Sequence, residues 1–478
     1  MRSRSPVSGL RRGELSFAQV LGQSVSAVAP SAVMVTLPAI VIPAAGSLTL
    51  AVFVVTALLM TAVGYCVSQF STRMVAVSGL YSYTVKGLGP IPGIGAGWSL
   101  LIGYAGAAMA STLGAASYLA ALLGRLGVPG GRPTVAVLAV AVGALALTLM
   151  IRGVRLSARI SLTVEVFAIL AAGAVLVIAF THALGDGSGN RPAPPAAPPE
   201  LGFALLLAIT SFVGFESAST VAREARRPFV TVTRAIRWSP VALGVLYLFA
   251  AAMQSTQTLV AGTGSIPIVL SMPSTGGSAS TALTILMELG IAASWFACVI
   301  GSTTALSRTL FAMGREGVVS RRMGRTHPVF RTPHIALLVA MPLIAAVPIG
   351  YLFVAGSSRE VLIGLLAVSA HGYVGAYLLV SLATPAFLHR IGELTRTPVL
   401  VGVASAALMI AIIGWAAFTV ESPVWIATAV YATLVATGYA LFVLRRRSVP
   451  DLTARVGVFD ETVAGDVLTD YNPWQVRP

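Results

Sequence analysis

The sequence predicts an all-α polytopic membrane protein with twelve transmembrane helices. Of its 478 residues, 56% are hydrophobic and only 10% are charged, and the mean hydropathy is +0.88. A soluble domain carries about 25% charged residues. Long apolar runs fill the chain, and each approaches the roughly 20 residues that a helix needs to cross a bilayer core of about 30 Å. The basic residues gather in alternate loops between these runs, as the positive-inside rule requires of a membrane protein.

The twelve predicted spans cover residues 18–42, 48–70, 93–123, 133–151, 160–183, 201–222, 239–256, 283–307, 334–355, 360–385, 398–420 and 422–444. Two loops, 185–200 and 257–282, are expected on the outer side. Segments 1–17 and 445–478 are expected to be cytoplasmic tails, the second partly disordered.

The charge distribution predicts the orientation of these spans. On this topology only four of the 31 Lys and Arg residues lie on one side, namely Arg125, Arg132, Arg191 and Arg359. The remaining twenty-seven lie on the other side, which we therefore predict to be cytoplasmic, together with both termini, in the cell membrane. The same asymmetry accounts for the net charge of +15, so we expect membrane lipid and no nucleic acid as a partner.

Few residues suggest chemistry of another kind. Cys66 and Cys298 both lie inside apolar runs, so neither a disulfide framework nor a metal-ligand spacing is predicted. The chain has no HExxH, GxSxG or GxxxxGK[ST] motif. We therefore expect no metal, no cofactor and no enzymatic activity, although a polytopic membrane enzyme stays open as the less favoured alternative.

The first span is interrupted near its middle. Pro30 is flanked by small residues from Ser24 to Ala32, and proline removes a backbone donor and clashes with the preceding turn. Carbonyls freed at this depth must be buried or line a cavity. Ala29, Pro30, Ser31 and Ala32 are thus expected to frame one pole of a binding site, although a simple kink is the plainer interpretation.

The sixth span carries a second interruption. Gly214 breaks the apolar pattern, and Glu216 follows two residues later. Ser211, Phe212, Val213 and Gly214 are expected to frame the other pole of the binding site, and Phe212 and Phe215 to gate or stack on the substrate side chain, although packing is the plainer interpretation of two phenylalanines in a membrane helix. An ionisable residue at membrane depth is a functional hypothesis by default. Glu216 is expected either to face the cavity, holding a substrate ammonium or a coupling proton, or to lock unwound backbone by accepting N–H bonds. The alternative interpretation is structural: Glu216 lies nearer the cytoplasm and pairs with an arginine there.

The two interruptions lie five spans apart. Paired broken helices at matching positions are the best sequence indicator of a transporter built from inverted repeats. We therefore predict two five-helix repeats, at about 18–183 and 201–385, which together form a transport core at 18–385. Spans eleven and twelve, within 398–444, are then peripheral.

Three stretches resemble the amino acid–polyamine–organocation permeases. FVGFESASTVAREARRPFVTVTRAI (212–236) is similar to the sixth-span signature of that superfamily. SGLYSYTVKGLGPIPGIGAGWSLLIGY (78–104) resembles its loop between spans two and three, and ALSRTLFAMGREGVVSRRMGRTHPVFRTPHIAL (305–337) resembles the stretch after span eight. The resemblance covers about residues 15–445.

The resemblance implies a leucine-transporter-like fold and secondary active transport of an amino acid or related amine by symport or exchange. Substrate would lie between spans 1, 3, 6, 8 and 10, which adds Tyr104 in span three to the candidates. In span eight, Ser302, Thr303 and Thr304 stand where hydroxyls would build a sodium site. Some proton-coupled members carry a lysine in span five; this chain has none there. Glu165 lies about a turn earlier and is a third ion-coupling candidate besides Ser302 and Thr303, so Na⁺ and H⁺ both stay open.

Other transporters remain as alternatives. A polyamine or organic-amine importer of the same fold fits the same motifs. A major-facilitator transporter would have a longer loop between spans six and seven. On the arginine-rich side, Glu224 and Glu316 are expected to form exposed gate pairs with Arg226, Arg227 and the arginines of 315–331.

Overall fold

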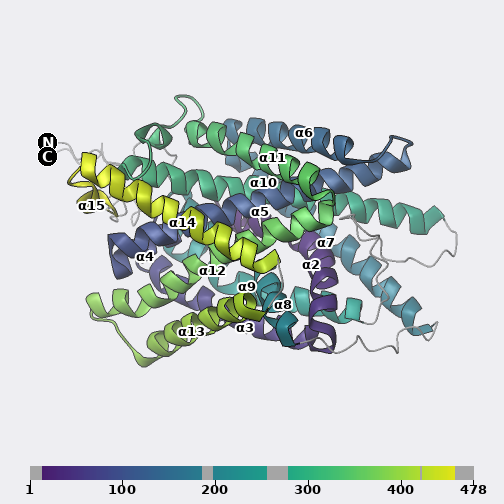
Figure 1. Cartoon of the computed structure of the whole chain (residues 1–478), viewed down its shortest axis with the longest axis horizontal. Coiled ribbons are helices and arrows are strands. Elements are labelled where there is room, and N and C mark those ends of the chain that lie inside the picture. Colours follow the sequence, from purple (N-terminus) through teal and green to yellow (C-terminus); the bar gives the residue numbers. More distant parts are fainter. Residues whose placement is uncertain (1–12, 186–197, 256–277, 420–422, 458–478) are drawn as a thin grey trace.

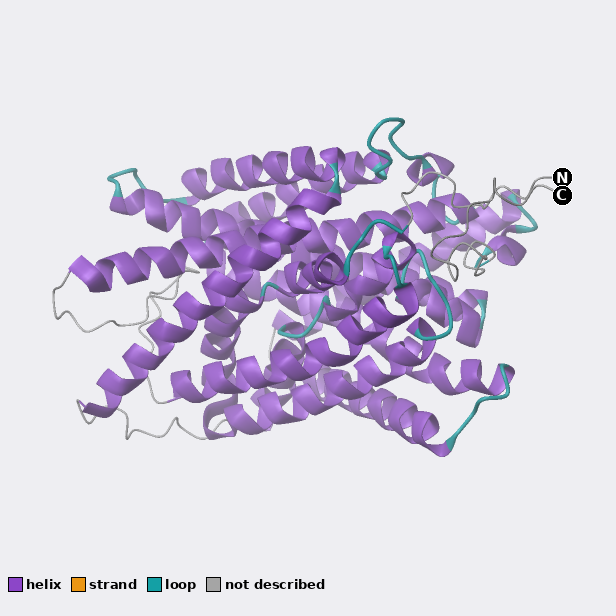
Figure 2. Cartoon of the chain, turned by 180° about the vertical axis from the view of Figure 1, so that it is seen from behind, coloured by secondary structure: helices purple, strands orange, loops and turns teal. Residues whose placement is uncertain are grey.

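The protein folds into a bundle in which most helices run roughly along one direction, while α2 crosses the others steeply (Figure 1). The structure is a computed structural model and describes residues 13–185, 198–255, 278–419 and 423–457. Within these ranges the chain forms helices and loops and no strand (Figure 2). The predicted outer loop 257–282 lies largely outside the described residues, as does most of 185–200.

The helices follow the predicted spans closely. In chain order they are α1 (Phe17–Val28), α2 (Pro30–Ala45), η1 (Gly46–Leu48), α3 (Thr49–Ser71), α4 (Leu80–Leu88), α5 (Pro90–Arg125), α6 (Arg132–Arg152), α7 (Val154–Gly185), α8 (Pro198–Thr210), η3 (Phe215–Glu224), α9 (Pro228–Ser255), α10 (Ser278–Glu316), η4 (Arg321–Gly324), α11 (His334–Ala355), α12 (Ser358–Arg390), α13 (Arg396–Thr419), α14 (Pro423–Ser448) and α15 (Leu452–Arg455).

Eleven stretches of the described chain are long and apolar enough to cross a membrane. The first, Phe17–Ser71, holds 55 residues and contains both of the first two predicted spans. These two spans merge because the short helix η1 continues directly into α3, with no polar loop between them. The all-helical, polytopic architecture predicted from the sequence is thus confirmed, while the number twelve stays a prediction.

Helix α5 forms the centre of the bundle, where it packs along both α10 and α12. Glycines allow this close approach. A Cβ on Gly372 of α12 would lie 2.5 Å from the amide nitrogen of Gly103 in α5, a distance that real Cβ atoms do not reach. Ser369 one turn earlier donates to the carbonyl of Gly103 at 2.8 Å. Spans three and ten are therefore held backbone to backbone beside the two interrupted helices.

Loops that the sequence assigns to one side meet at one end of the bundle. This arginine-rich end is on the left in Figure 1, where α4 and α15 lie. The segment before α1 pairs with the end of η3: Leu15 donates to the carbonyl of Glu224 at 2.7 Å, and Arg226 donates to that of Leu15 at 3.0 Å. Arg390 donates to the carbonyl of Lys86 at 2.9 Å.

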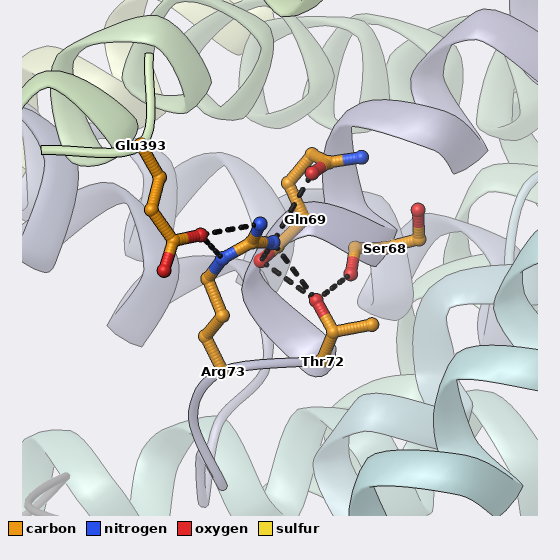
Figure 3. A network of polar contacts seen from close by, with 5 residues as sticks. All are labelled: Ser68, Gln69, Thr72, Arg73 and Glu393. Atoms are coloured by element: carbon orange, nitrogen blue, oxygen red, sulfur yellow. Dashed lines mark hydrogen bonds and ion pairs between the residues drawn. The ribbon is translucent and has the colours of Figure 1, made fainter. Parts of the chain in front are cut away.

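The end of α3 is tied to the loop after α12 at the same end (Figure 3). The guanidinium of Arg73 bonds the Glu393 carboxylate at 2.8 Å, the carbonyl of Gln69 at 2.8 Å and the hydroxyl of Thr72 at 3.0 Å. Both charged side chains are partly exposed, and pairs of this kind contribute only about 0–1 kcal/mol. The network orders this loop but contributes little to global stability.

The chain after the last span is more ordered than its polar sequence indicates. Helix α14 runs to Ser448, and Leu452 of α15 is fully buried. The amide of Gly457 donates to the Glu316 carboxylate at 2.8 Å. The stretch 452–457 therefore packs against the end of α10, whereas residues 458–478 lie outside the described chain.

Candidate substrate and coupling site

The break in the first span lies at Ala29. Its φ of 53° and ψ of 59° are left-handed, which ends α1 and starts α2 in a new direction. Pro30 takes the first position of α2, where a missing N–H costs nothing and the fixed φ suits a helix start. Left-handed backbone costs a non-glycine residue about 1–2 kcal/mol, so the surroundings must hold Ala29 in place.

The new helix start is occupied by a carboxylate from span five. Glu165 Oε1 accepts from the amide of Ser31 at 2.6 Å and from the hydroxyl of Ser294 at 3.0 Å. Ser294 Oγ also accepts, more weakly, from the amide of Ala32 at 3.4 Å. A helix N-terminus presents free N–H groups and a positive dipole end, so an anion is stabilised there. Glu165 is 1% exposed.

The break in the sixth span is longer than the first. Helix α8 ends at Thr210, residues 211–214 form a turn, and η3 continues as a 3₁₀ helix from Phe215. Gly214 has a φ of +102°, and a Cβ there would lie 2.7 Å from the carbonyl oxygen of Ala27. Only glycine satisfies both constraints.

The last turn of α1 is clamped between this break and span eight. On its other side, a Cβ on Gly301 of α10 would lie 2.5 Å from the amide nitrogen of Ala27. Cys298 Sγ donates to the carbonyl of Ala27 at 3.1 Å, and Gln23 Nε2 donates to that of Gly301 at 2.9 Å. The carbonyl of Ala27, next to the break, therefore has its partner on α10, and Gln23 of α1 satisfies a carbonyl of α10 in return.

Glu216 joins the break of span six to spans three and ten. Its Oε1 accepts from the Tyr104 hydroxyl at 2.9 Å, and its Oε2 accepts from the Tyr377 hydroxyl at 2.5 Å and from the amide of Gly214 at 3.1 Å. The side chain is fully buried. These contacts resemble the expected backbone-locking arrangement, except that the bound N–H belongs to span six and not to span one.

The remaining predicted residues lie around these two breaks. Ser211 and Val213 are buried in the turn. Phe212 packs edge-on against Tyr247 of α9, with ring centroids 5.2 Å apart, and Phe215 lies 5.8 Å from the ring of Tyr377. In span eight, Ser302 Oγ lies 3.5 Å from Cys298 Sγ. Thr303 and Thr304 are also buried on α10.

Residues that contact the breaks or their ligands and that sequence reasoning missed include Ser294, Cys298, Tyr373 and Tyr377. The two tyrosines are four residues apart in span ten and therefore share one helix face, which was an available signal. Tyr373 packs edge-on against Tyr104, with centroids 5.3 Å apart. Ser294 and Cys298 have the same spacing in span eight, but such small residues are common in membrane helices.

The prediction of exposed gate pairs on the arginine-rich side is wrong, because Glu224 and Glu316 have other partners than expected. Glu224 bonds both guanidinium nitrogens of Arg308, which lies inside α10 and is 3% exposed, and neither Arg226 nor Arg227 takes this place. Glu316 accepts from Tyr81 and Gly457. Helical phase causes the difference: Arg308 comes two turns before the end of α10 and faces inward.

Two helices of this protein are discontinuous, and buried polar groups at membrane depth tie them to each other and to continuous helices. This arrangement defines a membrane transporter of the inverted-repeat class. The chain belongs to the amino acid permease family, whose sequence pattern matches residues 15–442. It is a multi-pass membrane protein of a transporter family and not an enzyme.

Individual relatives are distant. The branched-chain amino acid permease of Bacillus subtilis is 25% identical over 300 residues, which are 59% of this chain and 63% of the relative. The methylthioribose transporter of the same organism is 25% identical over 311 residues, 60% of this chain and 64% of the relative. An uncharacterized transporter of Mycobacterium tuberculosis is 27% identical over 296 residues, again 59% and 63%. The matches thus span a little under two thirds of the relatives' own lengths.

A solved structure shares the fold. The manganese transporter of Eremococcus coleocola superposes with a TM-score of 0.51 at 15% identity, over 91% of this chain and 95% of its own. This likeness supports the leucine-transporter-like architecture and carries no information on cargo. Among the described residues, no group of three His, Cys, Asp or Glu side chains is arranged to hold a metal ion.

Proposed function

We propose that this permease moves an amino acid across the cell membrane by alternating access, with the substrate held between the breaks at Ala29 and Gly214. The observation that carries the proposal is the contact of the two breaks, since Gly214 lies against the carbonyl of Ala27. A zwitterion needs an anion site and a cation site only about 3 Å apart. The start of α2 supplies N–H groups and the end of α1 supplies carbonyls within one turn of each other.

We further propose that the substrate side chain is neutral and apolar. Tyr104, Phe215, Tyr373 and Tyr377 provide an aromatic surface beside the breaks. The oxygens of Glu216 already accept three hydrogen bonds, so a second cation would have to displace a donor. This favours an amino acid over a polyamine, which would need additional free carboxylates. The branched-chain amino acid permease among the relatives agrees with this choice.

Glu165 is the proposed coupling residue. Its carboxylate holds the N–H group at the start of α2 that a substrate carboxylate would use. Two anions cannot share this place, so substrate binding requires Glu165 to move or to take up a proton. Protonation by a coupling proton would release the amide of Ser31 for the substrate. Proton symport follows from this competition, and Ser302 and Thr303 become packing residues and not sodium ligands.

The test is uptake of labelled amino acids into proteoliposomes, with and without a pH gradient. Wild-type uptake should be driven by an inward proton gradient and competed by apolar amino acids, and not by polyamines. Glu165→Gln should lose the response to the gradient yet retain counterflow exchange, because a neutral side chain mimics the protonated state. Glu393→Gln, which alters an exposed pair, is the matched control. Sodium-driven uptake that is indifferent to pH would refute the coupling, and uptake of polyamines alone would refute the substrate class.

The orientation is proposed from charge. The arginine-rich end should face the cytoplasm, with both termini there, repeats at about 18–183 and 201–385, and peripheral helices within 398–444. A tag in 185–200 should be labelled from outside intact cells, and tags at either terminus should not. External labelling of a C-terminal tag would overturn the orientation.

A further inference from the structure

A cavity of about 390 Å³ opens at the arginine-rich end, away from the helix breaks. It is lined by Gly314, Arg315, Arg321, Gly324, Arg325 and Thr326. Of the six lining residues that belong to the described part of the chain, three are arginines and none is acidic. The transport mechanism proposed above makes no use of this cavity.

The three arginines come together because two glycines allow the loop to fold back on α10. A Cβ on Gly314 would lie 2.7 Å from the amide nitrogen of Gly324, and a Cβ on Gly324 would lie 2.9 Å from that of Arg315. No side chain fits between the two backbones. The fold therefore sets Arg321 and Arg325 of the loop beside Arg315 of the helix.

The nearest acidic residue in sequence is committed elsewhere. Both carboxylate oxygens of Glu316 accept hydrogen bonds, from Tyr81 and from the amide of Gly457. Within the described ranges, no carboxylate forms an ion pair with Arg321 or Arg325. Like charges gathered in one concave site repel each other, and a bound anion would offset that repulsion.

We propose that this cavity binds a phosphate group, either free or as the headgroup of an anionic phospholipid. Guanidinium groups donate pairs of parallel hydrogen bonds that match phosphate oxygens, and Arg is favoured wherever such planar recognition matters. A free phosphate carries about −1.5 to −2 charges, and the phosphodiester of a phosphatidylglycerol headgroup is also anionic, so either one would offset the repulsion between Arg321 and Arg325. Thr326 also lines the cavity.

Binding here would join the end of α10 to the following loop. Helix α10 also carries Ser294 and Cys298, which contact the first break. An anion in the cavity would therefore fix the position of the span that holds α1 in place. The binding itself can be measured without transport.

The test compares neighbouring arginines. Arg321→Gln and Arg325→Gln remove lining charges, whereas Arg322→Gln makes the same change at the adjacent exposed position, which does not line the cavity. All three positions are exposed, so the variants should purify as the wild type does. Binding of inorganic phosphate is measured by thermal shift in delipidated neutral micelles at constant ionic strength. Phosphatidylglycerol is tested in nanodiscs against phosphatidylcholine.

Two results support the proposal and identify the source. The ligand is the free ion if phosphate stabilises the wild type in micelles and its affinity falls about tenfold in both lining variants but less than twofold in Arg322→Gln. A tenfold change in affinity corresponds to about 1.4 kcal/mol. Stabilisation by phosphatidylglycerol alone, lost in the lining variants and kept in Arg322→Gln, indicates the lipid headgroup. Equal effects of all three substitutions would mean general attraction to surface charge, and absence of binding in both arms would overturn the site altogether.

Discussion

The three hydrogen bonds on Glu216 make Tyr377→Phe a sharp test of the site. The substitution removes one hydroxyl, keeps the ring, and leaves Oε2 with the amide of Gly214 as its remaining donor. A hydrogen bond to a charged acceptor contributes about 1.5–3 kcal/mol, so we expect the free energy of unfolding to fall by about 2 kcal/mol. Uptake should fall with it, because this bond fixes the break of span six to span ten.

A double-mutant cycle separates this bond from general packing. In a Glu216→Gln background the same hydroxyl faces a neutral amide, and a neutral bond contributes only about 1 kcal/mol. Tyr377→Phe should therefore be about 1 kcal/mol less destabilising in that background. Tyr373→Phe is the matched control, since Tyr373 lies one turn away on α12, is equally buried and makes no hydrogen bond to Glu216.

The assay is SDS-induced unfolding of the purified protein in mixed micelles, followed by far-UV circular dichroism, with proteoliposome uptake on the same preparations. We expect Tyr377→Phe to be more destabilising than Tyr373→Phe, and its coupling energy with Glu216→Gln to be about 1 kcal/mol. If Tyr377→Phe and Tyr373→Phe lower the free energy of unfolding equally, and neither is coupled to Glu216→Gln, the carboxylate does not organise this site.

Three further predictions follow from the helix breaks and the arginine-rich end. Ala29→Leu should abolish uptake because Ala29 is fully buried where the two breaks meet and a larger side chain would force them apart, whereas Ala29→Gly should retain it, since glycine adopts the left-handed backbone without strain; normal uptake by the leucine variant would mean a mere kink. Glu224→Gln should lower stability by about 3–5 kcal/mol because it leaves Arg308 buried without its counter-charge, and an unchanged SDS midpoint would contradict this. Gly301→Ala should destabilise by about 1–3 kcal/mol through a clash with the backbone of Ala27, measured against Gly350→Ala, where a Cβ meets open space.

The sequence was sufficient for the architecture because a bilayer imposes a simple rule. Every backbone polar group in lipid must be satisfied within a helix, so long apolar runs specify spans almost directly. The positions of the two breaks could also be predicted from the sequence, since Pro30 and Gly214 are residues that a continuous helix does not favour. Glu216 stood out because an ionisable side chain is rare at this depth.

The partners of these residues depended on the tertiary structure. Nothing in the sequence indicates that Glu165 of span five reaches the start of α2, or that Tyr377 of span ten bonds Glu216, because these pairs are 134 and 161 residues apart. The orientation of Arg308 toward Glu224 depends on the helical phase of α10, and hydropathy does not fix that phase in a helix whose polar residues are buried among apolar ones. Local composition determined where the chain crosses the membrane and where it breaks, and packing between distant helices determined which buried polar groups meet.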